Sequence, residues 1–242
     1  MIRLAMAVVA LGASAATAQT ATFSVPPNCT AYLTIQQKSC IVSHRFTCDG
    51  DPAGYQRRAD FDDQGMVYLG TIDAETRWIE SYYPQSNLVE RLMDGATDSA
   101  SFSDLIATNL DTYDFRTDSP GFGSFRYVGS DRLTGKTVTI DGVTLEVTEF
   151  SITAYDAEGT EMWRGAGNEF ISREWRMFIG GTSTQVSSTG TYDNDDTPME
   201  FAFPGESGFL SYTPKFGCGA VMSSAPALPV LPQNMESPHD NL

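Results

Sequence analysis

Short runs of alternating hydrophobic and polar residues follow one another along most of the chain. A period of two is typical of strands with one buried face. Because no long amphipathic helix separates the runs, the pattern excludes helix bundles and folds in which strands alternate with helices. The predicted strands cover residues 41–48, 66–72, 78–83, 88–93, 122–128, 136–140, 143–153, 160–164, 168–179, 182–192, 199–203 and 209–213.

Turn residues between these runs indicate how the strands connect. Asp141-Gly142 separates two alternating runs and predicts a two-residue hairpin turn. Turn-forming stretches at 156–159 and 204–208 predict longer hairpin loops. One strand in about every ten residues is typical of an antiparallel meander. We therefore predict an all-β fold that forms a barrel, half-barrel or sandwich, with few or no long helices.

Residues 101–110 fit two patterns. Ser101 and Asp104 have the spacing of a capping box that opens a short helix. The hydrophobic residues Phe102, Ile106 and Leu110 also fit the alternation of a strand. We favour the strand.

The two ends of the chain differ from this β-rich region. Residues 1–18 have the features of a signal peptide: the basic residue Arg3, an apolar stretch, and small residues before the cleavage point. Residues 220–242 contain several prolines, which suit neither helices nor central strands, and predict a flexible tail. We expect a single β-rich domain over 19–219 in a periplasmic or secreted protein, with no transmembrane segment after signal cleavage.

Because an exported protein reaches an oxidising compartment, we expect its four cysteines to form two disulfides. They are Cys29, Cys40, Cys48 and Cys218. A strand over 41–48 holds Cys40 and Cys48 about 26 Å apart, whereas a disulfide needs Cα atoms within about 7 Å. This distance excludes a Cys40–Cys48 bond. Two pairings remain open: Cys29–Cys40 with Cys48–Cys218, or Cys29–Cys48 with Cys40–Cys218.

An excess of acidic residues limits the partners of the chain. The 242 residues include 15 Lys+Arg and 31 Asp+Glu, a formal net charge of −16. Because binding of DNA or RNA requires clustered basic residues, this charge excludes a nucleic-acid partner. The stretch from Asp60 to Gly65 resembles the front of a calcium loop, but Thr71 stands where the closing Glu is required. We predict no metal and no cofactor.

Residues that carry common catalytic chemistry are scarce. The sequence has no Gly-x-Ser-x-Gly nucleophile motif and only two histidines, of which His239 lies in the predicted tail. Glycoside hydrolysis needs two carboxylates placed together, and neither Glu169 nor Glu174 has a recognisable partner. We assign no catalytic residue and favour a protein that is not an enzyme.

The stretch 168–179 is the most informative for a binding site. Read as a single strand, it places Arg173, Trp175 and Met177 on one face with apolar neighbours. A buried arginine needs an acidic or carbonyl partner. That partner is either an acidic residue of the protein, in a structural ion pair, or the acidic group of a ligand. We take Arg173, Trp175 and Met177 as candidate ligand-binding residues, together with His44 from the apolar face of strand 41–48.

Two stretches, Gly129-Ser130-Asp131-Arg132-Leu133-Thr134-Gly135-Lys136-Thr137-Val138-Thr139-Ile140-Asp141-Gly142-Val143 and Asn168-Glu169-Phe170-Ile171-Ser172-Arg173-Glu174-Trp175-Arg176, resemble exported alphaproteobacterial proteins of no assigned function. That resemblance implies no catalytic residues. In layout alone, an exported meander with an apolar lining is similar to periplasmic lipoprotein carriers and calycin barrels. Those carriers also contribute helices that cover the half-barrel, which this pattern lacks.

Three functions follow, in order of preference. The first is a binding or carrier protein for an apolar or amphiphilic small molecule, which a cavity with an apolar lining favours. The second is an envelope module that binds or assembles a protein partner, which a flat exposed apolar patch favours. The third is a hydrolase with an unrecognised carboxylate site, which a cleft holding carboxyl groups of strongly shifted pKa favours.

Overall fold

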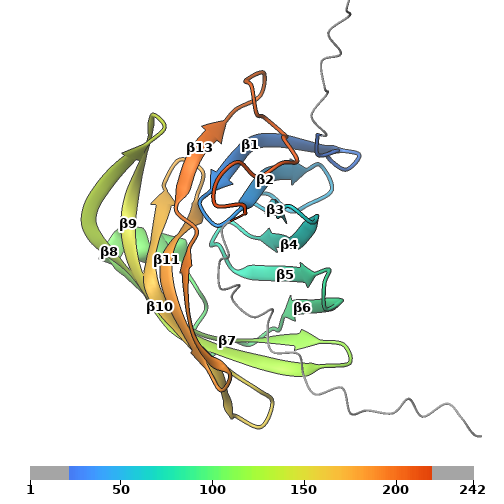
Figure 1. Cartoon of the computed structure of the whole chain (residues 1–242). Coiled ribbons are helices and arrows are strands. Elements are labelled where there is room, and N and C mark those ends of the chain that lie inside the picture. Colours follow the sequence, from blue (N-terminus) through green and yellow to red (C-terminus); the bar gives the residue numbers. More distant parts are fainter. Residues whose placement is uncertain (1–21, 220–242) are drawn as a thin grey trace, which may run out of the picture.

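The computed structural model describes residues 22–219, which form thirteen strands and one short helix. The predicted all-β fold is confirmed, and Figure 1 colours its elements along the chain. The signal peptide predicted for 1–18 and the tail predicted for 220–242 lie outside the described residues. The elements are β1 (Cys29–Gln37), β2 (Ile41–Cys48), β3 (Gln56–Phe61), β4 (Met66–Ile72), β5 (Trp78–Tyr83), β6 (Leu88–Leu92), α1 (Phe102–Thr108), β7 (Leu110–Ser119), β8 (Gly123–Ile140), β9 (Val143–Tyr155), β10 (Glu161–Ser172), β11 (Met177–Ser187), β12 (Gly190–Asp195) and β13 (Pro198–Ala202).

The strands form one antiparallel sheet that follows chain order from β1 to β12, with β13 added beside β1. The edges are therefore β12 and β13, although only Asp196 and Thr197 connect them. The Gln37 side chain donates to the Asp196 carbonyl oxygen at 3.1 Å, and the Lys38 backbone N–H donates to the Thr197 carbonyl oxygen at 3.0 Å. The meander curls on itself (Figure 1). Within the described part of the chain no ladder of hydrogen bonds joins its two edges, so the curled sheet is an open half-barrel.

Strand β7 shows how the sequence sets the two faces of the sheet. Its buried residues are Asp111, Tyr113, Phe115, Thr117 and Ser119. Because side chains alternate along a strand, this row lies on the concave face and the residues between lie on the convex face. Further along the sheet the register shifts between Leu133 and Thr137 and between Gly167 and Glu169. Such bulges bend a strand and increase its twist, which helps the long strands β8 and β10 to curve.

The hairpin predicted at Asp141-Gly142 is confirmed. β8 ends at Ile140 and β9 begins at Val143, and the two turn residues have φ angles of 47° and 79°. Positive φ at both central positions is required by the turn that matches the twist of two antiparallel strands, and Asp and Gly tolerate it.

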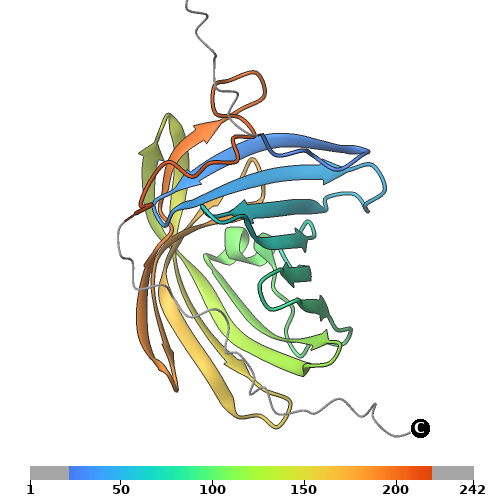
Figure 2. The ribbon, with the colours of Figure 1, turned by 45° about the vertical axis from the view of Figure 1, so that its right-hand side comes forward.

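The strand favoured for 101–110 is wrong, because α1 occupies Phe102–Thr108. The Ser101 hydroxyl accepts a hydrogen bond from the Asp104 backbone N–H at 3.1 Å, so the capping pattern prevails over the alternation. Phe102 and Leu105 are buried against Ile171 and other apolar residues of the sheet, which secures the short helix inside the curve (Figure 2). No helix between residues 22 and 219 is long and apolar enough to cross a membrane.

The single strand predicted over 168–179 is also wrong. Residues 173–176 form a turn between β10 and β11, and Arg176 adopts a φ of 46°. Because both strands of this hairpin are rich in apolar residues, the hydrophobic pattern continues across the turn and predicts a single strand. The sequence reading also missed β1, β3 and β7, and residues 209–213 form no strand beyond the isolated bridge of Ser211 with Thr22.

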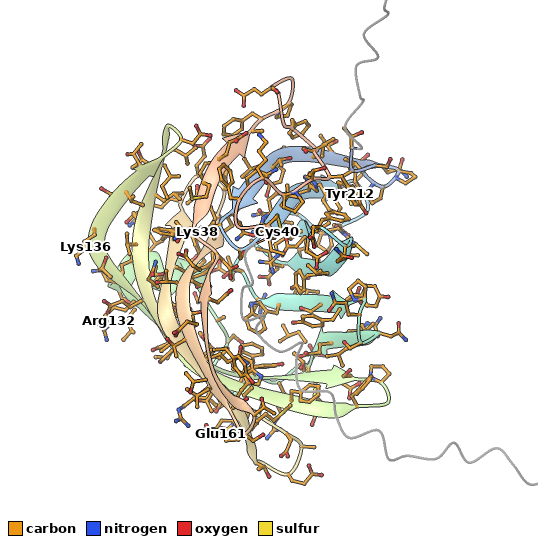
Figure 3. All side chains as sticks on the ribbon, in the orientation of Figure 1. Lys38, Cys40, Arg132, Lys136, Glu161 and Tyr212 are labelled. Carbon is orange, nitrogen blue, oxygen red and sulfur yellow. A yellow bond between two sulfur atoms is a disulfide. The ribbon has the colours of Figure 1, made fainter. Side chains whose placement is uncertain are left out.

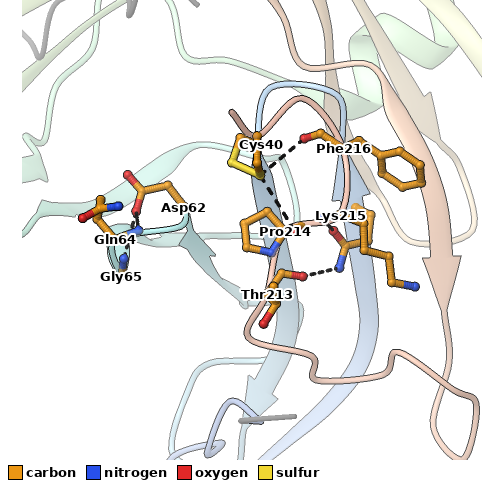
Figure 4. The surroundings of a disulfide bond; sticks show 10 residues. Cys40, Asp62, Gln64, Gly65, Thr213, Pro214, Lys215 and Phe216 are labelled. Atoms are coloured by element: carbon orange, nitrogen blue, oxygen red, sulfur yellow. Dashed lines mark hydrogen bonds between the residues drawn. A yellow bond between two sulfur atoms is a disulfide. The ribbon is translucent and has the colours of Figure 1, made fainter. Parts of the chain in front are cut away.

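Two disulfides fix the N-terminal strands. Cys29 bonds Cys48 across the β1–β2 ladder with a Cα–Cα distance of 3.9 Å, and Cys40 bonds Cys218 with a Cα–Cα distance of 4.8 Å. The structure therefore confirms the exclusion of a Cys40–Cys48 bond and selects one of the two pairings left open. Figure 4 shows the second bond, beside which the Cys40 backbone N–H donates to the Phe216 carbonyl oxygen at 2.9 Å. Paired cysteines are typical of proteins in an oxidising compartment.

The convex face is covered in one region and exposed in another. Phe23 and Tyr212, from the segments before β1 and after β13, pack on the buried aromatic and aliphatic residues of β2 and β3. On β8, by contrast, the exposed side chains of Arg132 and Lys136 project away from the sheet (Figure 3). The part of the fold that holds open space is the concave face.

Candidate functional site

Cross-strand pairs place a set of charged side chains on the concave face. Arg45 of β2 lies opposite Arg58 of β3, and Asp111 of β7 lies opposite Asp131 of β8. Glu169 of β10 lies two strands from Asp131 on the same face. Because paired residues of an antiparallel ladder share a face, the curl of the sheet turns these side chains toward one interior.

The interior contains two adjoining hollows, which we call together the interior cavity. The aromatic hollow has a volume of about 380 Å³ and the charged hollow about 500 Å³. They share four lining residues, Thr76, Trp78, Glu169 and Phe178, so they meet at these side chains. Volumes of roughly 300–1,000 Å³ are typical of small-molecule sites.

The aromatic hollow has a group of aromatic and aliphatic side chains beside polar ones that include Asp111 and Asp131. Trp78 meets the edge of Phe115 with ring centroids 5.6 Å apart, and Phe150, Ile152 and Trp163 continue the lining. Trp78 is 38% exposed although it belongs to this lining. An apolar lining with an exposed aromatic residue suits a ligand with an apolar portion.

The charged hollow is built around two arginines. The Nε of Arg58 lies 3.0 Å from Asp60 Oδ2 without hydrogen-bond alignment, and its guanidinium lies 4.3 Å from the centroid of the Tyr68 ring. The Ser43 hydroxyl donates to the other Asp60 oxygen at 2.6 Å. Arg45 is only 6% exposed, and its guanidinium forms no hydrogen bond or ion pair with any residue from 22 to 219. Of the three arginines that line the hollow, Arg57 pairs with Asp51, Arg58 pairs with Asp60 and Arg45 has no such partner in the described chain.

Two carboxyl groups of raised pKa line the interior cavity, Asp131 in the aromatic hollow and Glu169 where the two hollows meet. Burial, followed by repulsion from Glu169 and Asp111, raises the pKa of Asp131 far above its usual range. Burial also raises the pKa of Glu169, against the attraction of Arg58 and with the repulsion of Asp196. Neither carboxyl group receives a hydrogen bond from the described residues, which favours the neutral acid over the carboxylate.

Two other interior acids differ because they have partners. Asp111 accepts the Ser101 backbone N–H at 3.0 Å, and burial raises its pKa to about 6 in spite of that bond. Glu90 accepts hydroxyl groups from Thr117 at 2.7 Å and Tyr127 at 2.8 Å. Asp131 and Glu169 differ from these two acids in having no hydrogen-bond donor among the described residues, although Asp111 lines the same hollow as they do.

Arg173 and Trp175 lie in the turn between β10 and β11, outside the interior cavity. Arg173 forms a bidentate ion pair with Glu146, in which Nη2 lies 2.9 Å from Oε2. This arrangement is the structural ion pair that was the alternative to ligand contact. Trp175 packs on Phe201 and Phe203 and lines a separate shallow hollow beside Gln56.

Met177 and His44 are both fully buried, in different clusters. Met177 packs in the core between β1, β13 and β9–β11. His44 stacks on Phe23 at 4.9 Å between ring centroids, and its Nδ1 lies 3.0 Å from the Thr34 hydroxyl. Burial lowers the pKa of His44 to about 4, so its ring is neutral at physiological pH. The four candidate residues are thus not brought together, and none of them lines the interior cavity.

The residues that do line it were missed for a physical reason. Arg45 and Arg58 alternate with apolar residues in β2 and β3, and such alternation is typical of a solvent-facing charge. Only the curl of the sheet makes that face an interior. Glu169 was considered as a carboxylate, but its neighbour Asp131 comes from a strand far away in sequence. In the calcium-like stretch, the Asp62 carboxylate accepts hydrogen bonds from the backbone N–H groups of Gln64 and Gly65, so it stabilises the turn between β3 and β4 (Figure 4).

Comparison of the chain with known protein families, with curated proteins and with solved structures finds no match. The geometry of the interior cavity is therefore what indicates the function of this protein.

Proposed function

We propose that this is an exported binding protein, periplasmic or secreted, that holds an amphiphilic small molecule in the interior cavity. The observation that carries the proposal is the division of that cavity into an aromatic and a charged hollow that share a boundary. An amphiphile satisfies both, because its apolar part is removed from water while its polar part meets charged groups.

Exposed apolar side chains near the aromatic hollow support this proposal. Trp78 and Met93 are 38% and 40% exposed, and both belong to its lining. Apolar groups left open at a cavity suit entry of a ligand, whereas a cavity that only completes a core has no need of them.

Gly165 offers a way to fill the aromatic hollow. It lines the hollow, and a Cβ built on it meets its nearest atoms only at 3.7 Å, which is ordinary contact. Substitution Gly165→Leu therefore extends a side chain into the ligand space without a backbone clash. Ala166, its exposed neighbour on the opposite face of β10, provides the matched control Ala166→Leu.

Native mass spectrometry of protein purified from a periplasm tests the proposal. We expect a discrete mass surplus that denaturation removes, that persists in Ala166→Leu and that is lost in folded Gly165→Leu. A bare mass in the wild-type protein, with no change of its tryptophan emission on titration with amphiphiles, contradicts the proposal. Trp78 and Trp163 line the cavity and report on its occupation, whereas Trp175 lies outside it.

A second candidate function is hydrolysis by the carboxyl pair Asp131 and Glu169. The specific observation in its favour is that both pKa values are raised on one cavity wall, as expected of a general acid. A panel of chromogenic glycosides and esters tests it. Hydrolysis that is lost in both Asp131→Asn and Glu169→Gln supports this candidate, and no turnover above the buffer rate rejects it.

A further inference from the structure

The most unusual group of the interior cavity is Arg45. It is 6% exposed, lines the charged hollow, and has a buried Nε without a hydrogen-bond partner among residues 22–219. A buried cation without a partner is strongly unfavourable, since its desolvation is not compensated. Its direct neighbour across the ladder is a second arginine, Arg58, which adds repulsion.

Asp60 attracts Arg45 but makes its direct contacts with other residues. Both Asp60 oxygens are engaged, one by the Ser43 hydroxyl and the other by Arg58. Burial raises the pKa of Asp196, and it raises the pKa of Glu169 to about 7, so both carboxyl groups hold their protons more strongly than ordinary acids do. Burial and the nearby Arg58 lower the pKa of Arg45 to about 10, so it stays charged at neutral pH. Arg45 thus keeps its charge while the oxygens of the neighbouring Asp60 are in contact with Ser43 and Arg58.

We propose that Arg45 is the receptor for an anionic head group, a carboxylate or a phosphate, of the amphiphile whose apolar chain lies in the aromatic hollow. This inference rests on the proposed function and specifies its ligand class. The planar guanidinium of Arg45 donates charge-assisted hydrogen bonds to the oxygens of such a group. Arg58 adds attraction from the neighbouring strand while it stays paired with Asp60.

The arrangement of the cavity fits a ligand of this shape. The two hollows meet at Trp78 and Phe178, so an apolar chain passes from the charged side to the aromatic side between these rings. Glu169 at their boundary and Asp131 in the aromatic hollow have raised pKa values, so they repel an anion less than ordinary carboxylates do, and their protonated forms present O–H donors. A cationic head group, in contrast, meets two arginines in the charged hollow.

Four probes with the same chain distinguish the possible head groups: dodecanoate, dodecyl phosphate, uncharged dodecanoyl glycerol and dodecyltrimethylammonium. Each is titrated below its micelle concentration into wild-type protein, Arg45→Met, Arg45→Lys and Arg173→Met, with tryptophan emission and calorimetry as readouts. Arg173→Met is the matched control, because it removes a guanidinium that pairs with Glu146 outside the cavity. Thermal unfolding of each variant confirms that it folds.

We expect both anions to bind the wild-type protein more tightly than the uncharged and cationic probes do. Arg45→Met weakens anion binding by about 10- to 100-fold, the size of a hydrogen-bonded charge interaction, and leaves the uncharged probe unchanged. Arg45→Lys retains part of the affinity, and Arg173→Met all of it. A preference between dodecanoate and dodecyl phosphate identifies which anion the site fits.

Three results overturn the inference in different ways. Binding that is independent of head-group charge, or equal for wild type and Arg45→Met, refutes the role of Arg45 while the binding function stands. Tighter binding of dodecyltrimethylammonium assigns the head group to Asp131 and Glu169 and also refutes it. Absence of binding for all four probes refutes the inference together with the proposed function.

Discussion

Removal of each disulfide separately tests how the chain connectivity stabilises this half-barrel. The Cys29–Cys48 bond closes 19 residues and joins two residues that already face each other across a ladder. The Cys40–Cys218 bond closes 178 residues and ties the segment after β13 to the turn between β1 and β2. In the chain-entropy description, a disulfide stabilises by restricting the unfolded chain, and it does so more for a longer loop.

The loop lengths give the expected magnitudes. Loops of 19 and 178 residues correspond to losses of about 3 and about 5 kcal/mol of unfolding free energy at 25 °C. The double variant Cys40→Ala with Cys218→Ala is therefore less stable than Cys29→Ala with Cys48→Ala by about 2 kcal/mol. With a urea dependence of about 2 kcal/mol per molar, the two midpoints differ by about 1 M.

Urea unfolding followed by tryptophan emission measures both variants under the same conditions. Equal losses, or a greater loss for the Cys29–Cys48 bond, refute the reasoning from loop length. A second readout separates local from global effects, because Tyr212 packs on Phe61 at 4.2 Å between ring centroids. Early proteolysis after residue 208 with an unchanged midpoint shows that the segment detaches by itself, and it also contradicts the predicted global loss.

Three further predictions concern single residues. Burial lowers the pKa of His44 from 6.5 to about 4, so between pH 6.5 and pH 4 the unfolded state binds more protons than the folded state. The unfolding free energy therefore falls by about 3 kcal/mol as the pH drops through this range. In urea titrations at several pH values His44→Gln flattens this pH dependence, and the same pH dependence in wild type and variant contradicts the linkage. Asp131 has the opposite sign, since its raised pKa gives stability that is complete below pH 3.8 and is lost as pH rises through the folded value. Asp131→Asn is therefore more stable than wild type at neutral pH, by about 1.4 kcal/mol for each pH unit above 3.8 up to the folded pKa of about 8, and equal to it below pH 3.8. A variant less stable at neutral pH opposes this assignment. Ser101→Ala removes the cap that accepts the Asp104 N–H and lowers stability by about 1 kcal/mol in the same titration, and an unchanged midpoint shows that α1 is held by its packing alone.

The sequence predicts features of this fold that depend on local chemistry. Asp141-Gly142 identifies its hairpin because few residues tolerate positive φ at two consecutive positions. The length of strand 41–48 excludes one disulfide before any tertiary contact is known. Local reasoning fails where two local signals compete. At 101–110 a cap and an alternation coincide, and at 173–176 a turn without Gly or Pro lies between two hydrophobic arms.

The candidate site depends on information that no local pattern contains. Whether Arg45 faces solvent or an interior is decided by the curl of thirteen strands, to which the bulges at β8 and β10 contribute. Whether Asp131 and Glu169 share a wall is decided by the order of β8, β9 and β10 in that sheet. The sequence pattern shows that one strand face carries charge but does not show what surrounds that face. The pattern therefore favoured His44, on the more apolar face, as the ligand-binding residue of this strand.

The cost of Arg45 to the folded protein links stability to function. Replacement of a buried, poorly compensated charge by an apolar side chain of similar length commonly stabilises a protein by about 1–4 kcal/mol, so we expect Arg45→Met without ligand to unfold at a higher temperature than wild type. A ligand that binds only the folded state adds stability according to its concentration relative to its Kd. Dodecanoate that saturates wild type therefore raises the unfolding temperature of wild type more than that of Arg45→Met, and the difference between the two proteins narrows or reverses. An Arg45 that serves packing alone gives the contrary result in thermal unfolding, a variant that is less stable than wild type with or without dodecanoate.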